Sequence, residues 1–209
     1  MNGVFSEDAP PAMRLFYNAT SPYARIVRVA ISEKGLQGRI ELVETDPWLS
    51  PRELLEVNPL SKVPVLDIEG VGPVTESSVI AQVLDLLSPS FPLLPAAAPA
   101  RIDTLTRAAL AQGLIDAAFG AVLEGRRPEE RRWADWTGRL MAAVTRAIAR
   151  TAERRAPSDR FDLGDITLAV ALSYCRFRHP SLHWQDDHPG LAAWLARVER
   201  RPSLLSTQP

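Results

Sequence analysis

Ser21 is the residue whose type and position most suggest chemistry, because it places a hydroxyl directly before Pro22. Proline is favoured at the first position of a helix and serine at the N-cap before it. Val27 and Ile31 follow at helical spacing, so we predict a helix that ends near Gly35. A hydroxyl at a helix N-terminus can donate a hydrogen bond to a bound anion, or it can serve only as a cap.

Two other short segments combine polar or proline residues with the start of an element. Glu76 and Ser77 open a helical segment, where a hydroxyl and an acidic residue also suit simple capping. Pro64 enters a strand after Val63, which is typical of a sheet edge, and sequence alone predicts a trans bond before it. Both segments therefore have a structural interpretation beside a binding one.

Composition excludes several classes of function. The formal net charge is −1, so no global field draws the chain to nucleic acid or to acidic membranes. The single cysteine, Cys175, excludes an internal disulfide and a dithiol pair, and it lies in an apolar helical segment as a core residue would. The three histidines form no helical pair and have no cysteine partner, so we expect no metal site.

Apolar patterns predict two different halves. Residues 13–87 alternate strand and helix in the order βαβαββα, whereas helices alone fit the residues beyond 100, in which Ala, Arg and Leu dominate. We expect strands at Arg14–Tyr17, Ile40–Glu44, Val63–Asp67 and around Val74, and helices at 22–34, 51–57, 77–87, 101–124, 128–154, 162–177 and 189–200.

The composition also predicts the domain boundaries. Residues 1–12 are polar and patternless, so we expect a disordered leader without a signal peptide. Residues 88–99 hold four prolines and almost no charge, which is typical of a linker. We therefore expect an α/β domain at 13–87 and an all-helical domain at 100–209.

Four motifs in this order resemble the cytosolic glutathione transferases, and the likeness is to bacterial members of no assigned class. The resemblance spans roughly residues 14–203 and implies a thioredoxin-like βαβαββα domain followed by a helical bundle. The motifs are SPY at 21–23, NPLSKVPVL at 58–66, TES at 75–77 and DHPGLAAWLARVERRPS at 187–203.

The resemblance gives Ser21 a catalytic role. SPYA stands here where CPYC stands in glutaredoxins, so disulfide chemistry is lost at this position and a hydrogen bond to the sulfur of glutathione remains. Lowering a thiol pKa from ~8.5 by about two units requires roughly 2.7 kcal/mol. A hydrogen bond to a charged group supplies about 1.5–3 kcal/mol and the helix end roughly 0.3–1 kcal/mol, so one serine suffices. Thr20 is the rival hydroxyl, and Tyr17, within a strand, is a weaker candidate.

The same resemblance implies how glutathione is held. Pro64 is expected in the cis form, so that the backbone of Val63 pairs with the cysteinyl part of the peptide. Ser77 would bind the γ-glutamyl carboxylate beside helix N–H groups, with Glu76 facing the ammonium. Lys62 would reach the glycyl carboxylate, although a solvated lysine is equally compatible with its place on a loop.

Two pairs of residues have the spacing of a capping box. Ser50 and Glu53 have it around a proline at the first helical position. Asp162 and Asp165 have it at the start of the segment 162–177, where the family also carries a capping box. We expect Asp162 as N-cap and Asp165 bonded within the core, and neither as catalytic.

The expected function is a transferase that conjugates glutathione to a small, apolar electrophile, as in detoxification. The electrophile would contact the helical domain, with Phe119 and Trp133 as candidate residues. A glutathione-binding stress-response module with little turnover, or a glutathione-dependent peroxide or disulfide reductase, remain alternatives. The resemblance further implies a cytoplasmic homodimer that requires neither metal, nucleic acid nor membrane.

Overall fold

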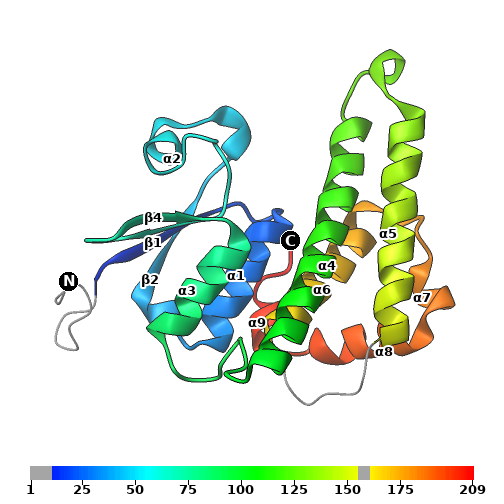
Figure 1. The fold of residues 1–209 in the computed structure, drawn as a ribbon. Coiled ribbons are helices and arrows are strands. Elements are labelled where there is room, and N and C mark those ends of the chain that lie inside the picture. The colour runs from blue at the N-terminus through cyan, green and yellow to red at the C-terminus, as the bar shows by residue number, and fades with distance from the viewer. Residues whose placement is uncertain (1–10, 155–160) are drawn as a thin grey trace. The chain divides into compact units, whose positions relative to one another are not determined.

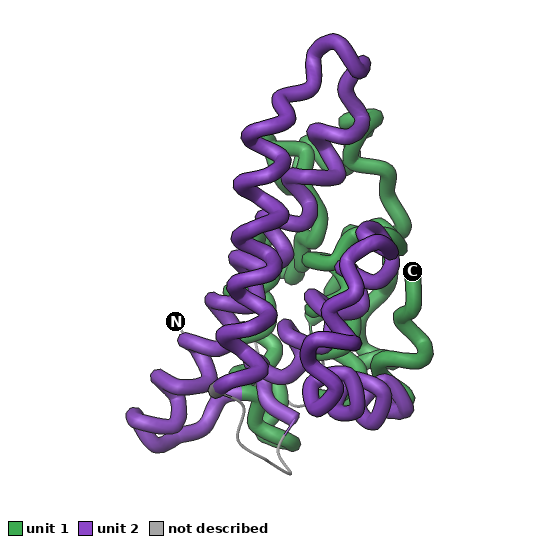
Figure 2. The backbone as a smooth tube through the Cα atoms, turned by 90° about the vertical axis from the view of Figure 1, so that its right-hand side faces the viewer, with its two compact units in different colours: residues 1–93, 202–209 green, residues 94–201 purple. Residues whose placement is uncertain are grey.

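The computed structural model describes residues 11–154 and 161–209, which form two compact units (Figure 2). The first unit contains the chain up to Leu93 together with Pro202–Pro209, and the second contains the residues between them. The protein is therefore divided as the change in composition indicates, except that its last eight residues pack with the first unit.

The division can be compared with the expected boundaries. The chain passes from one unit to the other inside the segment 88–99, which was expected as a linker. The expected helical domain, 100–209, is shorter than predicted because residues 202–209 belong to the first unit. The expected leader, 1–12, lies outside the described residues apart from its last two.

A four-stranded mixed sheet forms the centre of the first unit (Figure 1). β2 runs parallel to β1, whereas β3 is antiparallel to both β1 and β4. This topology confirms the thioredoxin-like βαβ and ββα order. In the order β2-β1-β3-β4 the strands are β2 (Ile40–Glu44), β1 (Met13–Tyr17), β3 (Val65–Ile68) and β4 (Gly72–Thr75).

Helices cover both faces of this sheet. α1 (Pro22–Glu33) and α3 (Ser77–Leu87) contact each other on one face (Figure 1). On the other face Phe16 of β1 packs in a buried cluster with Leu54 of α2 (Arg52–Val57). Side chains alternate between the faces of a strand, so each strand contributes to both layers of the core.

The predicted capping box before α2 is wrong. Pro51 is the N-cap of α2, and no side chain caps it. Ser50 instead has a left-handed backbone with φ of 46° and ends the 3-10 helix η2 (Pro47–Leu49). Ser61 Oγ donates its single proton to the carbonyl of Pro47 at 2.9 Å, so the Ser50 hydroxyl, 3.0 Å away, is the donor to Ser61 Oγ. A long-range partner thus replaces the local cap.

The C-terminal segment packs on α1. The guanidinium of Arg25, a residue only 4% exposed, donates to the Leu204 carbonyl at 3.2 Å and to Thr207 Oγ1 at 3.4 Å. Leu204 lies in the short helix α9 (Pro202–Leu205), and its side chain is fully buried. A buried cation without partners would be strongly destabilising, so these bonds explain why the segment folds with α1.

The second unit is a bundle in which α4 packs along both α5 and α6. α6 is buried along most of its length and contains Cys175, as predicted, and burial raises the pKa of that thiol to about 12. Among the described helices, α4 meets the length and hydropathy of a membrane span, a test that the core helix of a bundle also meets. The helices are α4 (Ala98–Gly125), α5 (Ala134–Arg154), α6 (Leu163–Arg178), α7 (Trp184–Asp187) and α8 (Pro189–Val198).

The predicted capping box at the start of α6 is confirmed. Asp162 Oδ1 accepts from the Asp165 N–H at 3.1 Å, and Asp165 Oδ2 accepts from the Asp162 N–H at 3.4 Å. Arg107 of α4 donates to Asp162 Oδ2 at 2.6 Å, and Thr104 Oγ1 donates to the same oxygen at 2.9 Å. Both carboxylates are therefore structural, and they join α4 to α6.

The predicted helix over 128–154 begins later than expected. A 3-10 turn, η3 (Glu129–Arg131), comes first, and α5 starts at Ala134. Glu124 explains the break, because its buried carboxylate accepts from the Trp133 N–H at 2.9 Å and so satisfies a donor at the start of α5. The short helices α7 and α9 were not predicted.

Candidate functional site

The register of the sheet brings the three candidate segments to one end of the first unit. Phe16 pairs with Val65, and Val65 pairs with Thr75, so these residues form one row across β1, β3 and β4. β1 leaves the sheet just after this row, β3 enters it just before, and β4 leaves it there. The segments at that end are the turn Asn18–Ser21, the bond Val63–Pro64 and the pair Glu76–Ser77.

Ser21 occupies the N-cap of α1, with Pro22 at the first helical position. Its Oγ accepts a hydrogen bond from the Ala24 N–H at 3.2 Å. The residue is half-buried, and it points its hydroxyl at the N-terminal end of a helix, where the dipole favours an anion. Capping uses a lone pair of the hydroxyl and leaves its proton for another acceptor.

Asn18 organises the turn that carries both candidate hydroxyls. Its carbonyl accepts from the Ser21 N–H at 3.1 Å. Its side-chain Oδ1 accepts from the Thr20 N–H at 3.1 Å and from Thr20 Oγ1 at 2.8 Å. Its Nδ2 donates to the carbonyl of Thr45 at 3.4 Å. Residue types in the sequence pointed to Thr20 and Ser21 and gave Asn18 no role.

Three other polar residues lie close to this turn in the chain. The guanidinium of Arg28 stacks on the ring of Tyr17, with Cζ 4.7 Å from the centroid. Arg25 lies on the same helix, one turn before Arg28. It is buried against the C-terminal segment, so it does not face water. No local pattern marks that contact, because its partners lie at the far end of the sequence.

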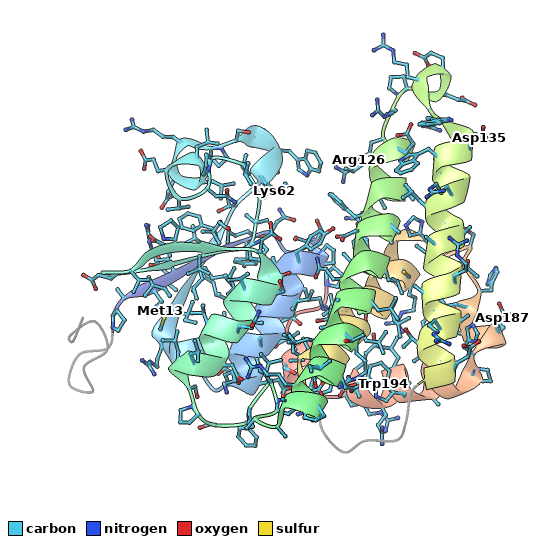
Figure 3. The ribbon with its side chains drawn as sticks, viewed as in Figure 1. Met13, Lys62, Arg126, Asp135, Asp187 and Trp194 are labelled. Carbon is cyan, nitrogen blue, oxygen red and sulfur yellow. The ribbon has the colours of Figure 1, made fainter. Side chains whose placement is uncertain are left out.

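The bond between Val63 and Pro64 is cis, as the resemblance implies. The side chain of Val63 packs into the cluster around Phe16. The preceding loop is shaped by Asn58, whose Oδ1 accepts from the Leu60 N–H at 3.1 Å and whose Nδ2 donates to the Lys62 carbonyl at 2.9 Å. Lys62 itself is exposed on the loop between α2 and β3 (Figure 3).

Glu76 and Ser77 begin α3 in a way that simple capping does not explain. Glu76 is the N-cap, yet its side chain makes no capping bond, and its φ is 67°. A residue other than glycine in this region costs of order 1–3 kcal/mol and often marks a functional site. Ser77 is buried at the first helical position, beside the N–H groups of the first turn. The pair therefore offers an exposed carboxylate and a helix N-terminus within two residues.

These groups suit an anionic peptide more than a metal. Hydroxyls, a backbone edge and helix N-termini all favour carboxylate or thiolate groups. Within residues 11–154 and 161–209 there is no group of three His, Cys, Asp or Glu side chains that could hold a metal ion.

A thioredoxin-like unit followed by an all-helical unit is the fold of the glutathione transferase-like proteins. Family models agree: the glutathione S-transferase N-terminal domain matches residues 20–87 and the C-terminal domain residues 106–197. The chain belongs to the glutathione S-transferase family.

Several relatives are similar along nearly the whole chain. A glutathione transferase family member from Pseudomonas fluorescens Pf-5, solved with bound glutathione, is 37% identical with a TM-score of 0.90 and covers 94% of this chain and 98% of its own. The glutathione S-transferase of Methylobacterium radiotolerans, in complex with glutathione sulfonate, is 38% identical with a TM-score of 0.87, covering 94% of both chains. The uncharacterized GST-like protein YibF of Escherichia coli is 27% identical, covering 94% of this chain and 98% of YibF.

Proposed function

We propose that this protein is a glutathione transferase in which Ser21 stabilises the thiolate of glutathione for attack on a small, apolar electrophile. The observation that carries the proposal is the Ser21 hydroxyl, which caps α1 through a lone pair and keeps its proton for the sulfur. The setting that we propose is detoxification in the cytoplasm, where glutathione is kept reduced.

In this proposal the segments around Val63 and Ser77, at the same end of the sheet as Ser21, bind glutathione. Val63, beside the cis Pro64, pairs through its backbone with the cysteinyl residue, and Ser77 receives the γ-glutamyl carboxylate at the start of α3. Glu76 faces the ammonium, and Lys62 reaches the glycyl carboxylate. The Pseudomonas relative, solved with bound glutathione at 37% identity, supports this ligand.

The chemical step is a nucleophilic attack that Ser21 assists without losing its own proton. The thiol proton leaves to water, the sulfur forms a bond to the electrophilic carbon, and any leaving group departs with its electron pair. The helical unit carries apolar surface of its own, where the rings of Trp133 and Trp136 stack with centroids 6.0 Å apart. Trp133 is 63% exposed, and Phe119 of α4 is half-buried.

The Ser21→Ala variant tests the proposal. We expect the pKa of the bound glutathione thiol to rise by about one to two units, because a donor to a charged group contributes about 1.5–3 kcal/mol. The thiolate fraction near neutral pH, and with it the conjugation rate, should then fall roughly tenfold to a hundredfold. Glutathione affinity should change little, because Val63, Glu76 and Ser77 hold the peptide. The measurement is the ultraviolet absorbance of the thiolate against pH, alongside conjugation rates.

Two outcomes would contradict the proposal. A wild-type complex that titrates like free glutathione would leave a binding module without thiol activation. A lowered thiol pKa with turnover of peroxides or disulfides, but of no electrophile, would favour the reductase alternative.

We also propose that the protein is a homodimer. Val79 and Leu86 of α3 are 45% and 85% exposed. A contiguous apolar patch that includes both would be the surface of such an interface. Light scattering at micromolar concentration should give twice the monomer mass, and Leu86→Glu should lower it. A monomer mass for the wild type would show that these side chains do not mediate assembly.

A further inference from the structure

Two neighbouring hydroxyls, those of Thr20 and Ser21, stand at the N-terminus of α1. Serine and threonine hydroxyls have the same hydrogen-bonding capacity, one proton to donate and two lone pairs. Residue type therefore does not decide which of them activates the thiol. The partners of each hydroxyl do.

The amide of Asn18 has one possible orientation. Its Nδ2 lies 3.4 Å from the Thr45 carbonyl, which can only accept, and its Oδ1 lies 3.1 Å from the Thr20 N–H, which can only donate. Exchanging the two amide atoms would place donor against donor and acceptor against acceptor. The atom that faces Thr20 Oγ1 at 2.8 Å is therefore an oxygen, and Thr20 must be the donor.

The turn is held so that this arrangement persists. The Asn18 carbonyl accepts from the Ser21 N–H at 3.1 Å, which closes the turn. Thr45, the partner of the Asn18 amide, is itself buried and donates its N–H to the Tyr17 carbonyl at 2.7 Å. Asn18 therefore ties the turn to the end of β1 while it accepts the hydrogen bond that the Thr20 hydroxyl donates.

We propose that Asn18 is a positioning residue that engages the Thr20 proton and so leaves thiol activation to Ser21. Ser21 Oγ accepts from the Ala24 N–H at 3.2 Å, which does not use its proton and makes that proton a better donor. The inference rests on the proposed function and goes beyond it, since it names the residue that selects between the two hydroxyls.

The test compares removal of each hydroxyl with and without the Asn18 side chain. With Asn18 present, Thr20→Val should leave the pKa of the bound thiol unchanged, whereas Ser21→Ala should raise it by about one to two units. In the Asn18→Ala background Thr20 is released, so the double variant Asn18→Ala/Ser21→Ala should recover roughly tenfold of the rate lost in Ser21→Ala. Asn18→Asp keeps an acceptor for Thr20 but loses the donor to Thr45 and adds a negative charge, which raises the thiol pKa overall. Within that background Thr20→Val should again leave the thiol pKa unchanged and Ser21→Ala should again raise it.

Asn58 offers a matched control. It forms the same kind of turn, with its carbonyl bonded to the Ser61 N–H and its Oδ1 to the Leu60 N–H, but leucine has no hydroxyl to engage. Asn58→Ala should weaken glutathione binding and lower the melting temperature. In the Asn58→Ala background Thr20→Val should still leave the thiol pKa unchanged, and Ser21→Ala should still raise it.

Two results would overturn the role of Asn18 while the proposed function stands. One is a rise in thiol pKa on Thr20→Val alone, measured with Asn18 in place. The other is a folded, glutathione-binding double variant no faster than Ser21→Ala. If Asn18→Ala does not fold, the Asn18→Asp background replaces it, and a rise in thiol pKa on Thr20→Val in that background would overturn the role. If the thiol of glutathione bound to the wild-type protein titrates as it does in free solution, the proposed function is refuted, and the Asn18 role with it.

Discussion

In the proposed function, the side chain at position 21 decides which sulfur chemistry the first unit performs. A cysteine at a helix N-terminus has a lowered pKa and attacks disulfides as a thiolate. Serine at the same place forms no disulfide, and its hydroxyl can only donate to or accept from a sulfur that another molecule brings. The helix end and the neighbouring turn would be the same for both residues, so in the proposed function the change of one atom separates reduction from conjugation.

Ser21→Cys should therefore exchange one chemistry for the other. Its thiolate should attack oxidised glutathione, forming a mixed disulfide with the protein while one glutathione thiolate leaves. Mass spectrometry should show the mass gain of one glutathionyl group and a loss of conjugation. The wild type is the control, because burial raises the pKa of its single thiol, that of Cys175, to about 12. A folded variant without the adduct would mean that glutathione does not reach position 21.

At this scale residue types in the sequence single out the candidate residues but do not predict how their hydrogen bonds are distributed. Ser21 as N-cap follows from local preferences that hold in many proteins. The engagement of Thr20 by Asn18 depends on the amide orientation, which Thr45 on another loop determines. The burial of Arg25 depends on Thr207, 182 positions further along.

Element starts show the same limit of local patterns. Ser50 and Asp162 both have the spacing of a capping box, yet only Asp162 forms one. The hydroxyl of Ser50 meets Ser61, whose backbone is also left-handed, and that contact competes with the cap. At Asp162 the tertiary partner, Arg107, adds to the local bonds instead of replacing them. A helix cap can therefore be predicted from sequence where long-range contacts reinforce the local hydrogen bonds.

The Asp162 cap should make the stability of the second unit depend on pH. Burial by itself would raise the pKa of Asp162, but its bonds with Arg107 and Thr104 hold that pKa below the ordinary value. Its contribution is then complete above about pH 4, the pKa in the unfolded chain, and is lost as pH falls through the lower folded pKa. Asp162→Ala should lower the free energy of unfolding at pH 7 by about 2–3 kcal/mol.

Urea unfolding at pH 7 and near pH 3 measures this difference, which should shrink at the lower pH. Asp103→Asn is a matched control, because its carboxylate binds the same Arg107 but its side chain is 68% exposed. Exposed pairs contribute about 0–1 kcal/mol, so this control should lose little. An equal loss for Asp103→Asn and Asp162→Ala would show that the cap is not what stabilises α6.

On the scale of the whole molecule, the two ends of the chain contribute to one unit. Sequence patterns predicted the change from mixed sheet to helical bundle, because composition shifts sharply across residues 88–99. They did not predict that residues 202–209 pack with the first unit, because α9 is too short to show a period. Its contacts instead come from single side chains, such as Ser203, whose hydroxyl donates to Glu33 at the end of α1.

This arrangement leads to a prediction about two adjacent leucines of α9. Leu204 is fully buried, whereas Leu205 is 54% exposed, so the two positions share a helix and a residue type but not an environment. Leu204→Ala should lower the stability of the first unit by about 2–5 kcal/mol, as expected for a cavity in a packed core. Leu205→Ala should change it by less than about 0.5 kcal/mol. Hydrogen exchange of the α1 amides measures the effect where the segment packs, and the exchange should quicken only in Leu204→Ala.

Deletion of residues 202–209 should quicken this exchange further, because Arg25 would lose the Leu204 carbonyl and the Thr207 hydroxyl together. Equal exchange in the two alanine variants would mean that the C-terminal segment does not stabilise α1.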